Sequence, residues 1–166
     1  MERIDVSVLM AVYKKDNPAF LRESLESIFT QTVEAGEVVL LEDGPLTEAL
    51  YEVIKLYQSK YPALRVVAYS VNRGLGKTLN DGLQLCKYDI VARMDADDIC
   101  KSNRFETEYK WLKTHEDYDV IGSWVDEFTK DKTQVRSIRK VPEQYEDIKK
   151  YARYRCPVNH PTVMYR

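Results

Sequence analysis

Four short apolar runs, alternating with segments of helical periodicity, constrain the fold of this chain more than any other sequence feature. The runs cover residues 6–12, 38–41, 66–69 and 89–94. A strand that is apolar at nearly every position is typical of a parallel sheet covered on both faces. Asn17-Pro18 follows the first run as a helix cap with a first-turn proline, and apolar residues then recur at helical spacing. The alternation predicts an α/β fold.

The apolar positions of the three helices predicted between these runs are Leu21, Leu25, Ile28 and Phe29; Leu50, Val53, Ile54 and Tyr57; and Leu75, Leu79, Leu83 and Cys86.

After residue 98 the pattern loosens. Four elements are expected there: a helix opened by a capping-box-like Asn103 and Glu106, a strand over 120–125, an excursion or hairpin over 126–140, and a helix with Pro142 in its first turn. A chain of 166 residues is long enough for one core, so we expect one domain over 1–166. Strand-like residues run up to Arg166 with no turn signal after them, which suggests a chain shortened at its C-terminus.

Charge, hydropathy and cysteine content exclude several classes of protein. The chain has 25 Lys and Arg against 27 Asp and Glu and no basic block, so it lacks the charge for non-specific nucleic-acid binding. No apolar run is long enough for a transmembrane segment, and the N-terminus lacks a signal region. Cys86, Cys100 and Cys156 form no CxxC pair, which favours reduced thiols in a cytoplasmic protein.

Polar or aromatic residues follow each predicted strand. They are Ala11-Val12-Tyr13-Lys14, Glu42-Asp43-Gly44, Asn72-Arg73-Gly74 and Asp95-Ala96-Asp97-Asp98. Ligands of parallel sheets gather beyond the carboxyl ends of the strands, where loops and helix N-termini offer unpaired N–H groups. We therefore expect the functional site along this edge.

The acidic cluster is the sharpest signal at this edge. Asp95, Asp97 and Asp98 repel one another, and a cation would offset that repulsion. Mg²⁺ and Mn²⁺ take one or two carboxylates together with the phosphates of a substrate. The alternative is that Asp97 or Asp98 only caps the next helix.

The other strand ends each allow two interpretations. Tyr13 either packs in a core or stacks on a nucleobase. Asp43 is either an ordinary turn residue before a glycine or an acceptor for uracil N3–H. Arg73 either lies on the surface or holds a base carbonyl or a phosphate. His160 is equally open between a structural and a functional role.

The segment Gly74-Leu75-Gly76-Lys77-Thr78 resembles the end of a P-loop, but Val71 stands where that motif needs its first glycine. This argues strongly against a nucleoside-triphosphatase loop, while Lys77 remains a candidate contact for a ligand phosphate. No Gly-x-Gly-x-x-Gly follows the first strand, which argues against a dinucleotide site.

Taken together, these residues resemble the family 2 glycosyltransferases, inverting nucleotide-sugar enzymes of GT-A fold. The resemblance rests on the strand 6–13 ending in Tyr13, on Leu41-Glu42-Asp43-Gly44, on Asn72-Arg73-Gly74 with Asn80-x-Gly82, and on the Asp-x-Asp element at 95–97. The tail 159–164 is similar to a segment of bacterial members that build cell-surface polysaccharides.

The resemblance implies a Rossmann-like, mostly parallel sheet with helices on both faces, in which 1–98 binds the nucleotide and 99–166 begins the acceptor half. It implies that Tyr13 stacks on the base, Asp43 holds uracil N3, and Arg73 supports the base. Ala11, Lys77 and Ala96 would also line the nucleotide-sugar site.

The cofactor implied is Mn²⁺ or Mg²⁺. Asp95 and Asp97 would hold the ribose and the metal, with Asp97 as the direct ligand. The implied donor is a UDP-sugar, and the implied acceptor is a glycan or a lipid-linked glycan, with peripheral association at the inner face of the membrane.

Three departures from the family pattern make base preference less secure than metal use: Ala11 in place of proline or threonine, Glu42 in place of the first Asp, and Pro45 in place of Ser. The family's general base belongs to a Glu-Asp pair after a Gly-Gly stretch. Neither Glu116-Asp117 nor Glu146-Asp147 has that context, so the catalytic base is expected beyond residue 166.

Two other functions stay open at this point. A nucleotidyltransferase also needs a metal-bound diphosphate, but it should carry a glycine-rich basic loop after the first strand, and residues 11–16 contain no glycine. A non-catalytic nucleotide-binding module would keep the same site without turnover.

Overall fold

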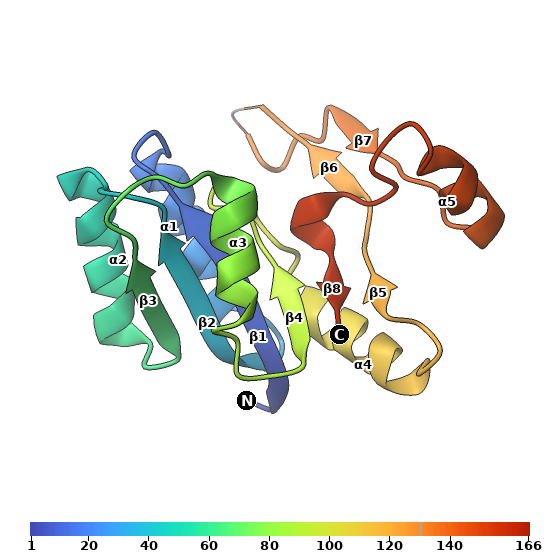
Figure 1. The fold of residues 1–166 in the computed structure, drawn as a ribbon, viewed down its shortest axis with the longest axis horizontal. Coiled ribbons are helices and arrows are strands. Elements are labelled where there is room, and N and C mark those ends of the chain that lie inside the picture. The colour runs from blue at the N-terminus through green and yellow to red at the C-terminus, as the bar shows by residue number, and fades with distance from the viewer. Residues whose placement is uncertain (130) are drawn as a thin grey trace.

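The computed structural model describes residues 1–129 and 131–166, which form a six-stranded sheet and a separate two-stranded hairpin (Figure 1). The strands are β1 (Arg3–Val12), β2 (Glu34–Glu42), β3 (Leu64–Ala68), β4 (Ile90–Arg93), β5 (Val120–Ile121), β6 (Val125–Glu127), β7 (Ser137–Arg139) and β8 (Met164–Tyr165). The helices are α1 (Pro18–Phe29), α2 (Glu48–Lys60), α3 (Leu75–Leu83), α4 (Arg104–Thr114) and α5 (Tyr145–Tyr151), with a 3₁₀ turn η1 (His160–Thr162).

The main sheet has the strand order β3-β2-β1-β4-β8-β5. Strands β1 to β4 pair in parallel, and β8 runs antiparallel to both β4 and β5. The predicted α/β fold with a mostly parallel sheet is therefore confirmed.

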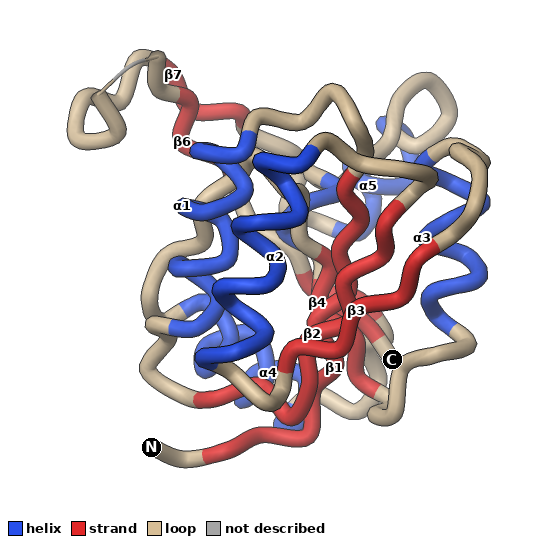
Figure 2. Tube along the Cα trace, turned by 90° about the vertical axis from the view of Figure 1, so that its left-hand side faces the viewer, coloured by secondary structure: helices blue, strands red, loops and turns tan. Residues whose placement is uncertain are grey.

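Both faces of the sheet are covered, which explains why β1 is apolar on both sides. Val8 and Met10 pack into the larger core with α1, α2 and α4. Leu9 packs into a second cluster that includes Leu79 of α3. Figure 2 shows α3 on one side of the strands and α1 and α2 on the other.

The predicted strand over 120–125 is wrong as a single element, because it divides into β5 and β6. Between them, Ser123 donates its backbone N–H to the Thr162 hydroxyl at 3.0 Å, and its carbonyl accepts the Asn159 side-chain amide at 2.9 Å. Side chains around η1 thus take the backbone bonds that a continuous strand would need. The predicted hairpin over 126–140 is confirmed as β6–β7.

Helix α4 exists as predicted, but its predicted capping box is wrong. Asn103 makes no side-chain cap bond, and the Glu106 carboxylate instead accepts from the Thr32 hydroxyl at 2.7 Å. The cap comes from another element, since Gln31 Oε1 accepts the Phe105 N–H at 3.1 Å. A glutamine far away in sequence leaves no local pattern, so the sequence could not reveal it.

Some predicted boundaries also shift. The last helix begins at Tyr145, three residues beyond Pro142. Tyr69 and Cys86 lie just past β3 and α3, respectively. The cysteines are free thiols, as predicted. Within 1–129 and 131–166, no helix is long and apolar enough to cross a membrane.

Gly82 allows α3 to lie close to the sheet, and this contact generates a prediction for stability. A Cβ at Gly82 would meet the Leu41 and Leu9 side chains at 2.4 and 2.8 Å, whereas a Cβ at Gly76 in the same helix would meet nothing within 4 Å. We expect Gly82→Ala to lower the free energy of unfolding by about 1–3 kcal/mol, because overpacking displaces the helix. Gly76→Ala should leave it equal or raise it by up to about 1 kcal/mol.

Urea unfolding of the two variants measures both effects. Equal stability of Gly82→Ala and Gly76→Ala would contradict this account of the α3 contact.

Candidate functional site

The carboxyl ends of the parallel strands meet at one edge, and the site is built there. Val12 of β1 lies beside Glu42 of β2, and the chain after β4 continues alongside β1, with the Met94 N–H donating to the Leu9 carbonyl at 3.0 Å. Since Leu9 is paired with Arg93, this register brings Asp95 level with Ala11. The loop after β4 therefore lies next to the loop after β1.

Asp95, Asp97 and Asp98 form a compact acidic cluster, with one carboxylate oxygen from each lying within 4.8 Å of the others. Burial raises the pKa of Asp98, and the charges of Asp95 and Asp97 raise it further. Among the described residues, the Asp97 carboxylate makes no hydrogen bond or ion pair, and it is exposed. Hard oxygen donors in this arrangement fit a divalent cation such as Mg²⁺ or Mn²⁺.

Asp16 is a further carboxylate at this site that the sequence analysis missed. Burial raises the pKa of Asp16, and the charges of Asp97 and Asp95 also raise it. Its Oδ2 accepts the backbone N–H of Tyr13 at 2.9 Å, which ties the loop after β1 into a turn. The available signal was its place three residues after Tyr13, but nothing local to the sequence indicated that this loop faces the cluster.

Asp43 lies at the site edge but is fully engaged within the protein. Oδ1 accepts the Arg73 N–H at 2.7 Å and the Thr78 hydroxyl at 2.9 Å, and Oδ2 accepts from the Asn72 amide and the Gly74 N–H, both at 3.0 Å. A carboxylate offers about four lone-pair sites. Asp43 thus organises the loop before α3, and a uracil N3–H could bond to it only by sharing or displacing one of these donors.

Three other predicted site residues lie at the same edge of the sheet, and their side chains differ in exposure and in contacts: Tyr13, Arg73 and Lys77. The Tyr13 side chain is 40% exposed, so its ring is open to a ligand. The Arg73 guanidinium lies 3.8 Å above the Tyr69 ring and forms an ion pair with Asp81 at 2.5 Å, so it is already held in place. Lys77 is exposed in the first turn of α3.

The two alanines predicted to line the site have different positions. Ala11 is half-buried and packs with the cluster under α3, while Ala96 is buried in the larger core. Ala96 therefore separates Asp95 from Asp97 by pointing inward.

Arg93, one residue before Met94-Asp95, is the second residue that the sequence analysis missed. Its side chain is 2% exposed and forms an ion pair with the Asp95 carboxylate. By strand alternation it shares the face of Val91, which packs into the cluster under α3. A guanidinium thus lies beneath the acidic cluster.

His160 lies in η1, which packs against β4. Burial lowers the pKa of His160, the charge of Arg93 lowers it further, and the charge of Asp95 acts in the opposite direction. The residue singled out near the end of the chain is therefore close enough to the acidic cluster to interact with its charges.

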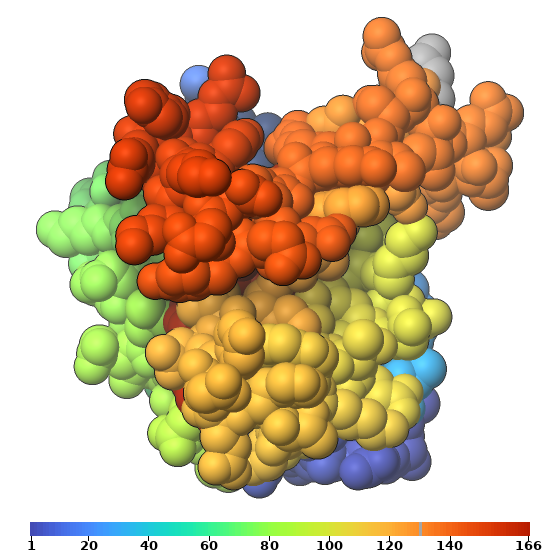
Figure 3. Space-filling model, turned by 90° about the vertical axis from the view of Figure 1, so that its right-hand side faces the viewer, coloured from blue at the N-terminus to red at the C-terminus, as the bar shows by residue number. Residues whose placement is uncertain are grey.

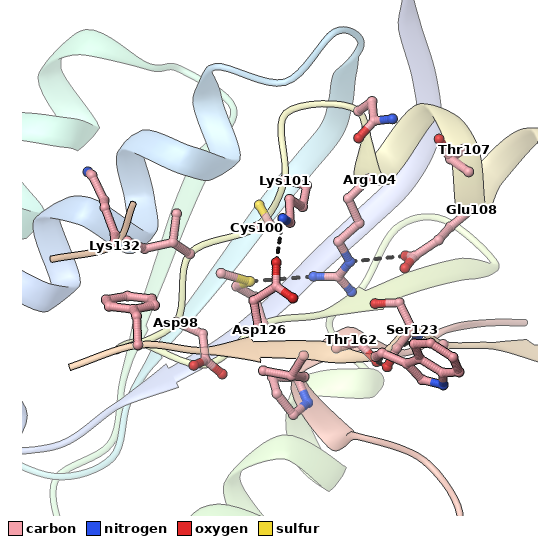
Figure 4. A pocket seen from close by; sticks show the side chains of 18 of the residues that line it. Asp98, Cys100, Lys101, Arg104, Thr107, Glu108, Ser123, Asp126, Lys132 and Thr162 are labelled. Atoms are coloured by element: carbon pink, nitrogen blue, oxygen red, sulfur yellow. Dashed lines mark hydrogen bonds and ion pairs between the residues drawn. The ribbon is translucent and has the colours of Figure 1, made fainter. Parts of the chain in front are cut away.

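Two cavities flank the cluster. One of about 1190 Å³ lies between Phe20 of α1, Asp97 and Asp98, and the β6–β7 hairpin. The other, of about 620 Å³, is lined by the loop from Asp98 to Asn103, by α4 and by the β5–β6 connection (Figure 4).

Comparison of this sequence with known proteins shows the family to which the chain belongs. A model of glycosyl transferase family 2 matches residues 7–166, and the chain belongs to that family. It is 44% identical over 160 residues to an uncharacterized glycosyltransferase of Haemophilus influenzae, covering 96% of this chain and 60% of that protein.

It is also 41% identical to the Escherichia coli UDP-Gal:alpha-D-GlcNAc-diphosphoundecaprenol beta-1,3-galactosyltransferase, covering 96% of this chain and 58% of the relative. The chain thus spans about 60% of the length of these curated relatives.

The fold is likewise that of known glycosyltransferases. The mannosyltransferase PcManGT from Pyrobaculum calidifontis, in complex with GDP-Man and Mn²⁺, superposes with a TM-score of 0.63 at 22% identity, covering 74% of this chain and 36% of that one. The predicted GT-A, Rossmann-like class and the predicted family are confirmed.

The smaller cavity contains a buried ion pair that generates a prediction for pH dependence. Arg104 Nε lies 3.0 Å from Glu108 Oε2, while Glu108 Oε1 is buried without a hydrogen-bond partner among the described residues. Burial raises the pKa of Glu108 to about 7, against the pull of Arg104. The folded protein therefore keeps this proton to a higher pH than the unfolded chain does.

The stability contributed by that proton is present at low pH and lost as pH rises through about 7. We expect the wild-type chain to lose about 1–3 kcal/mol more unfolding free energy between pH 5 and 8 than Glu108→Gln loses. Chemical denaturation at both pH values measures the difference. Glu48→Gln, a change at an exposed side chain, is the matched control and should keep the wild-type slope. The same slope in Glu108→Gln would contradict the raised pKa.

Proposed function

We propose that this chain forms the donor-binding part of a metal-dependent, inverting glycosyltransferase. It would transfer a sugar from a nucleotide sugar, with UDP as the expected nucleotide, to a glycan or lipid-linked acceptor. The observation that carries the proposal is the acidic cluster of Asp95, Asp97 and Asp98 beside the open ring of Tyr13. In this proposal residues 1–98 bind the nucleotide and 99–166 begin the acceptor half.

The residues of the cluster have separate roles in the proposed mechanism. Asp97, exposed and without a partner among the described residues, is the direct metal ligand, and Asp95 lies beside it towards the ribose. A bound Mn²⁺ or Mg²⁺ supplies positive charge next to the leaving diphosphate. Lys77, exposed at the start of α3, offers a second positive charge to the phosphates.

Base recognition is assigned to the loops after β1 and β2. Tyr13 stacks on the base through its exposed ring. Asp43 acts through the loop that it organises, and Arg73 supports the base from its position over Tyr69. Uridine is preferred because the Escherichia coli relative is named for UDP-Gal, whereas the Pyrobaculum structure holds GDP-Man.

The acceptor hydroxyl needs a general base within hydrogen-bond reach. Glu116-Asp117 lies in an exposed turn after α4, and Glu146-Asp147 lies in the exposed first turn of α5. We assign the base to neither pair and propose that it lies in the part of the relatives' length that this chain does not span. The cavity beside Asp97 and Phe20 is the proposed space for the reacting sugar.

Family membership favours this function over the two alternatives. A nucleotidyltransferase would need a glycine-rich loop where the chain instead forms the Tyr13–Asp16 turn. A non-catalytic module would bind the nucleotide but never transfer a sugar even with the rest of the relatives' length present, so transfer by a chain of that full length separates it from the proposal.

We also propose peripheral contact with the cytoplasmic face of a membrane, since the Escherichia coli relative is named for a diphosphoundecaprenol-linked acceptor. Helix α5 contains no buried residue, and Tyr145 and Tyr154 are 71% and 86% exposed. Exposed cations lie among them: Lys149, Lys150, Arg153 and Arg155. Tyrosines favour the membrane interface, and basic residues favour anionic headgroups. In Figure 3 this segment protrudes from the upper part of the molecule.

The metal assignment predicts a loss of nucleotide affinity in one variant. Asp97→Asn should weaken UDP binding in Mn²⁺ at least about tenfold, a loss of about 1.4 kcal/mol. It should leave the ligand-free melting temperature equal or higher, because one like-charge repulsion is removed. Asp117→Asn, at an exposed aspartate of the turn after α4, is the control and should bind as the wild type does.

Isothermal titration with UDP, and with ADP as the competing nucleotide, measures these effects. Unchanged Mn²⁺-dependent affinity in Asp97→Asn would sink the metal assignment. Equal affinity for UDP and ADP in the wild type would overturn the uridine preference alone.

The membrane proposal predicts selective binding to anionic vesicles. The chain should co-sediment with phosphatidylglycerol-containing vesicles and much less with phosphatidylcholine vesicles. Replacing both Lys149 and Lys150 with Glu should reduce binding at least about fivefold, since each basic residue contributes about 1 kcal/mol near such a surface. Tyr145→Ser with Tyr154→Ser should also weaken it, whereas Leu56→Ser, at an exposed apolar residue of α2, should not. Equal binding to both kinds of vesicle would refute the proposal.

A further inference from the structure

Arg93 is an unusual residue for its position. It is the last residue of β4, a strand that lies between β1 and β8 in the middle of the sheet. Its side chain is 2% exposed: Nη1 is ion-paired with Asp95 Oδ1, and Nε has no hydrogen-bond partner among the described residues. A buried guanidinium is costly unless it is paired, and an apolar side chain of similar volume would avoid that cost.

Asp95 is the ion-pair partner of Arg93. The Asp95 side chain is 31% exposed, so the buried guanidinium holds from beneath a carboxylate that faces solvent. The backbone of Asp95 is held as well, because its carbonyl accepts the Ser24 hydroxyl at 2.8 Å. Asp95 is therefore fixed on two sides, while Asp97 makes no such bond.

The charge of Arg93 also reaches the rest of the cluster. One carboxylate oxygen from each of Asp95, Asp97 and Asp98 lies within 4.8 Å of the others, so a guanidinium paired with Asp95 also acts on the other two carboxylates. The three carboxylates alone would carry three negative charges, and Arg93 offsets one of them. Asp16 adds a further carboxylate at this site, so with a divalent ion bound a diphosphate would meet a less negative site with Arg93 than without it.

We propose that Arg93 is a positioning residue of the donor site: it keeps Asp95 out of the metal's coordination sphere and offsets one carboxylate charge, so that metal and nucleoside diphosphate bind together. The inference rests on the proposed function, because it concerns the same metal and nucleotide. It assigns a role to a residue that touches neither of them.

This role predicts two opposite shifts in one variant. In Arg93→Gln the cluster gains a negative charge and Asp95 is free to join Asp97 and Asp98. Mn²⁺ alone should therefore bind at least about threefold tighter than to the wild type. UDP at saturating Mn²⁺ should bind about tenfold weaker, because Asp95 is displaced and the site is more negative. Arg93→Lys keeps the charge, so its affinities for Mn²⁺ and for UDP should lie between those of the wild type and those of Arg93→Gln.

Titrations of Mn²⁺ alone and of UDP in saturating Mn²⁺ measure both shifts, and thermal unfolding of each ligand-free variant reports on the fold. If Arg93 had only a structural role, its loss would weaken both ligands or neither, and either result would overturn the inference. A wild-type chain that binds no UDP in Mn²⁺ would overturn the proposed function and this inference with it. Normal wild-type binding without opposite shifts in Arg93→Gln would overturn only the inference.

Asp95→Asn is a second variant that tests the same inference if Arg93→Gln does not fold. Because Asp95 is paired with Arg93 rather than with the metal, its loss should reduce affinity for Mn²⁺ alone far less than Asp97→Asn does. UDP without metal should bind tighter to Asp95→Asn than to the wild type, since the guanidinium is no longer neutralised. Equal losses of Mn²⁺ affinity in the two aspartate variants would contradict the role of Arg93.

Discussion

Repulsion among carboxylates at the end of β4 is the constraint on which the rest of this structure depends. Asp95, Asp97 and Asp98 lie within one small volume, and Asp16 faces them from the loop after β1. Such a cluster costs folding free energy unless opposite charge lies close to it. Arg93 provides that charge from inside the protein, and in the proposed function a divalent cation would provide it from the solvent side. The same feature that strains the ligand-free site therefore favours metal binding.

The buried side chain of Arg104 connects this site to the second part of the chain. Arg104 Nη2 donates to the Arg93 carbonyl at 2.9 Å and is 3.4 Å from the Val163 carbonyl, and Nη1 lies 3.4 Å from the Met94 sulfur. One side chain of α4 thus joins the end of β4 to the segment that leads into β8. Because β8 pairs antiparallel with β4, the acidic cluster is held between elements from both parts of the sequence.

A carboxylate also organises the loop before α3, where hydrogen-bond donors rather than a charge surround it. Asp43 collects two backbone N–H groups, a hydroxyl and an amide from residues 72–78, and this bonding turns the chain into α3. Gly74 has a φ of 84° there, in the left-handed region that glycine adopts without strain. Asp43, the residue expected to contact a base, thus holds together the loop that would surround that base.

The sequence by itself determined the alternation of strands and helices, the position of the candidate site residues at the carboxyl ends of the strands and the position of the acidic cluster. These follow from local periodicity and from residues adjacent in the chain, such as Asp95 and Asp97, so a single sequence suffices. Only the tertiary structure decided that Arg93 lies beneath Asp95, that Gln31 caps α4 and that Asn159 interrupts the strand predicted over 120–125. Those contacts depend on which strands become neighbours and on which face a side chain is buried, and strand pairing between distant segments is a property of the packed chain rather than of any local pattern.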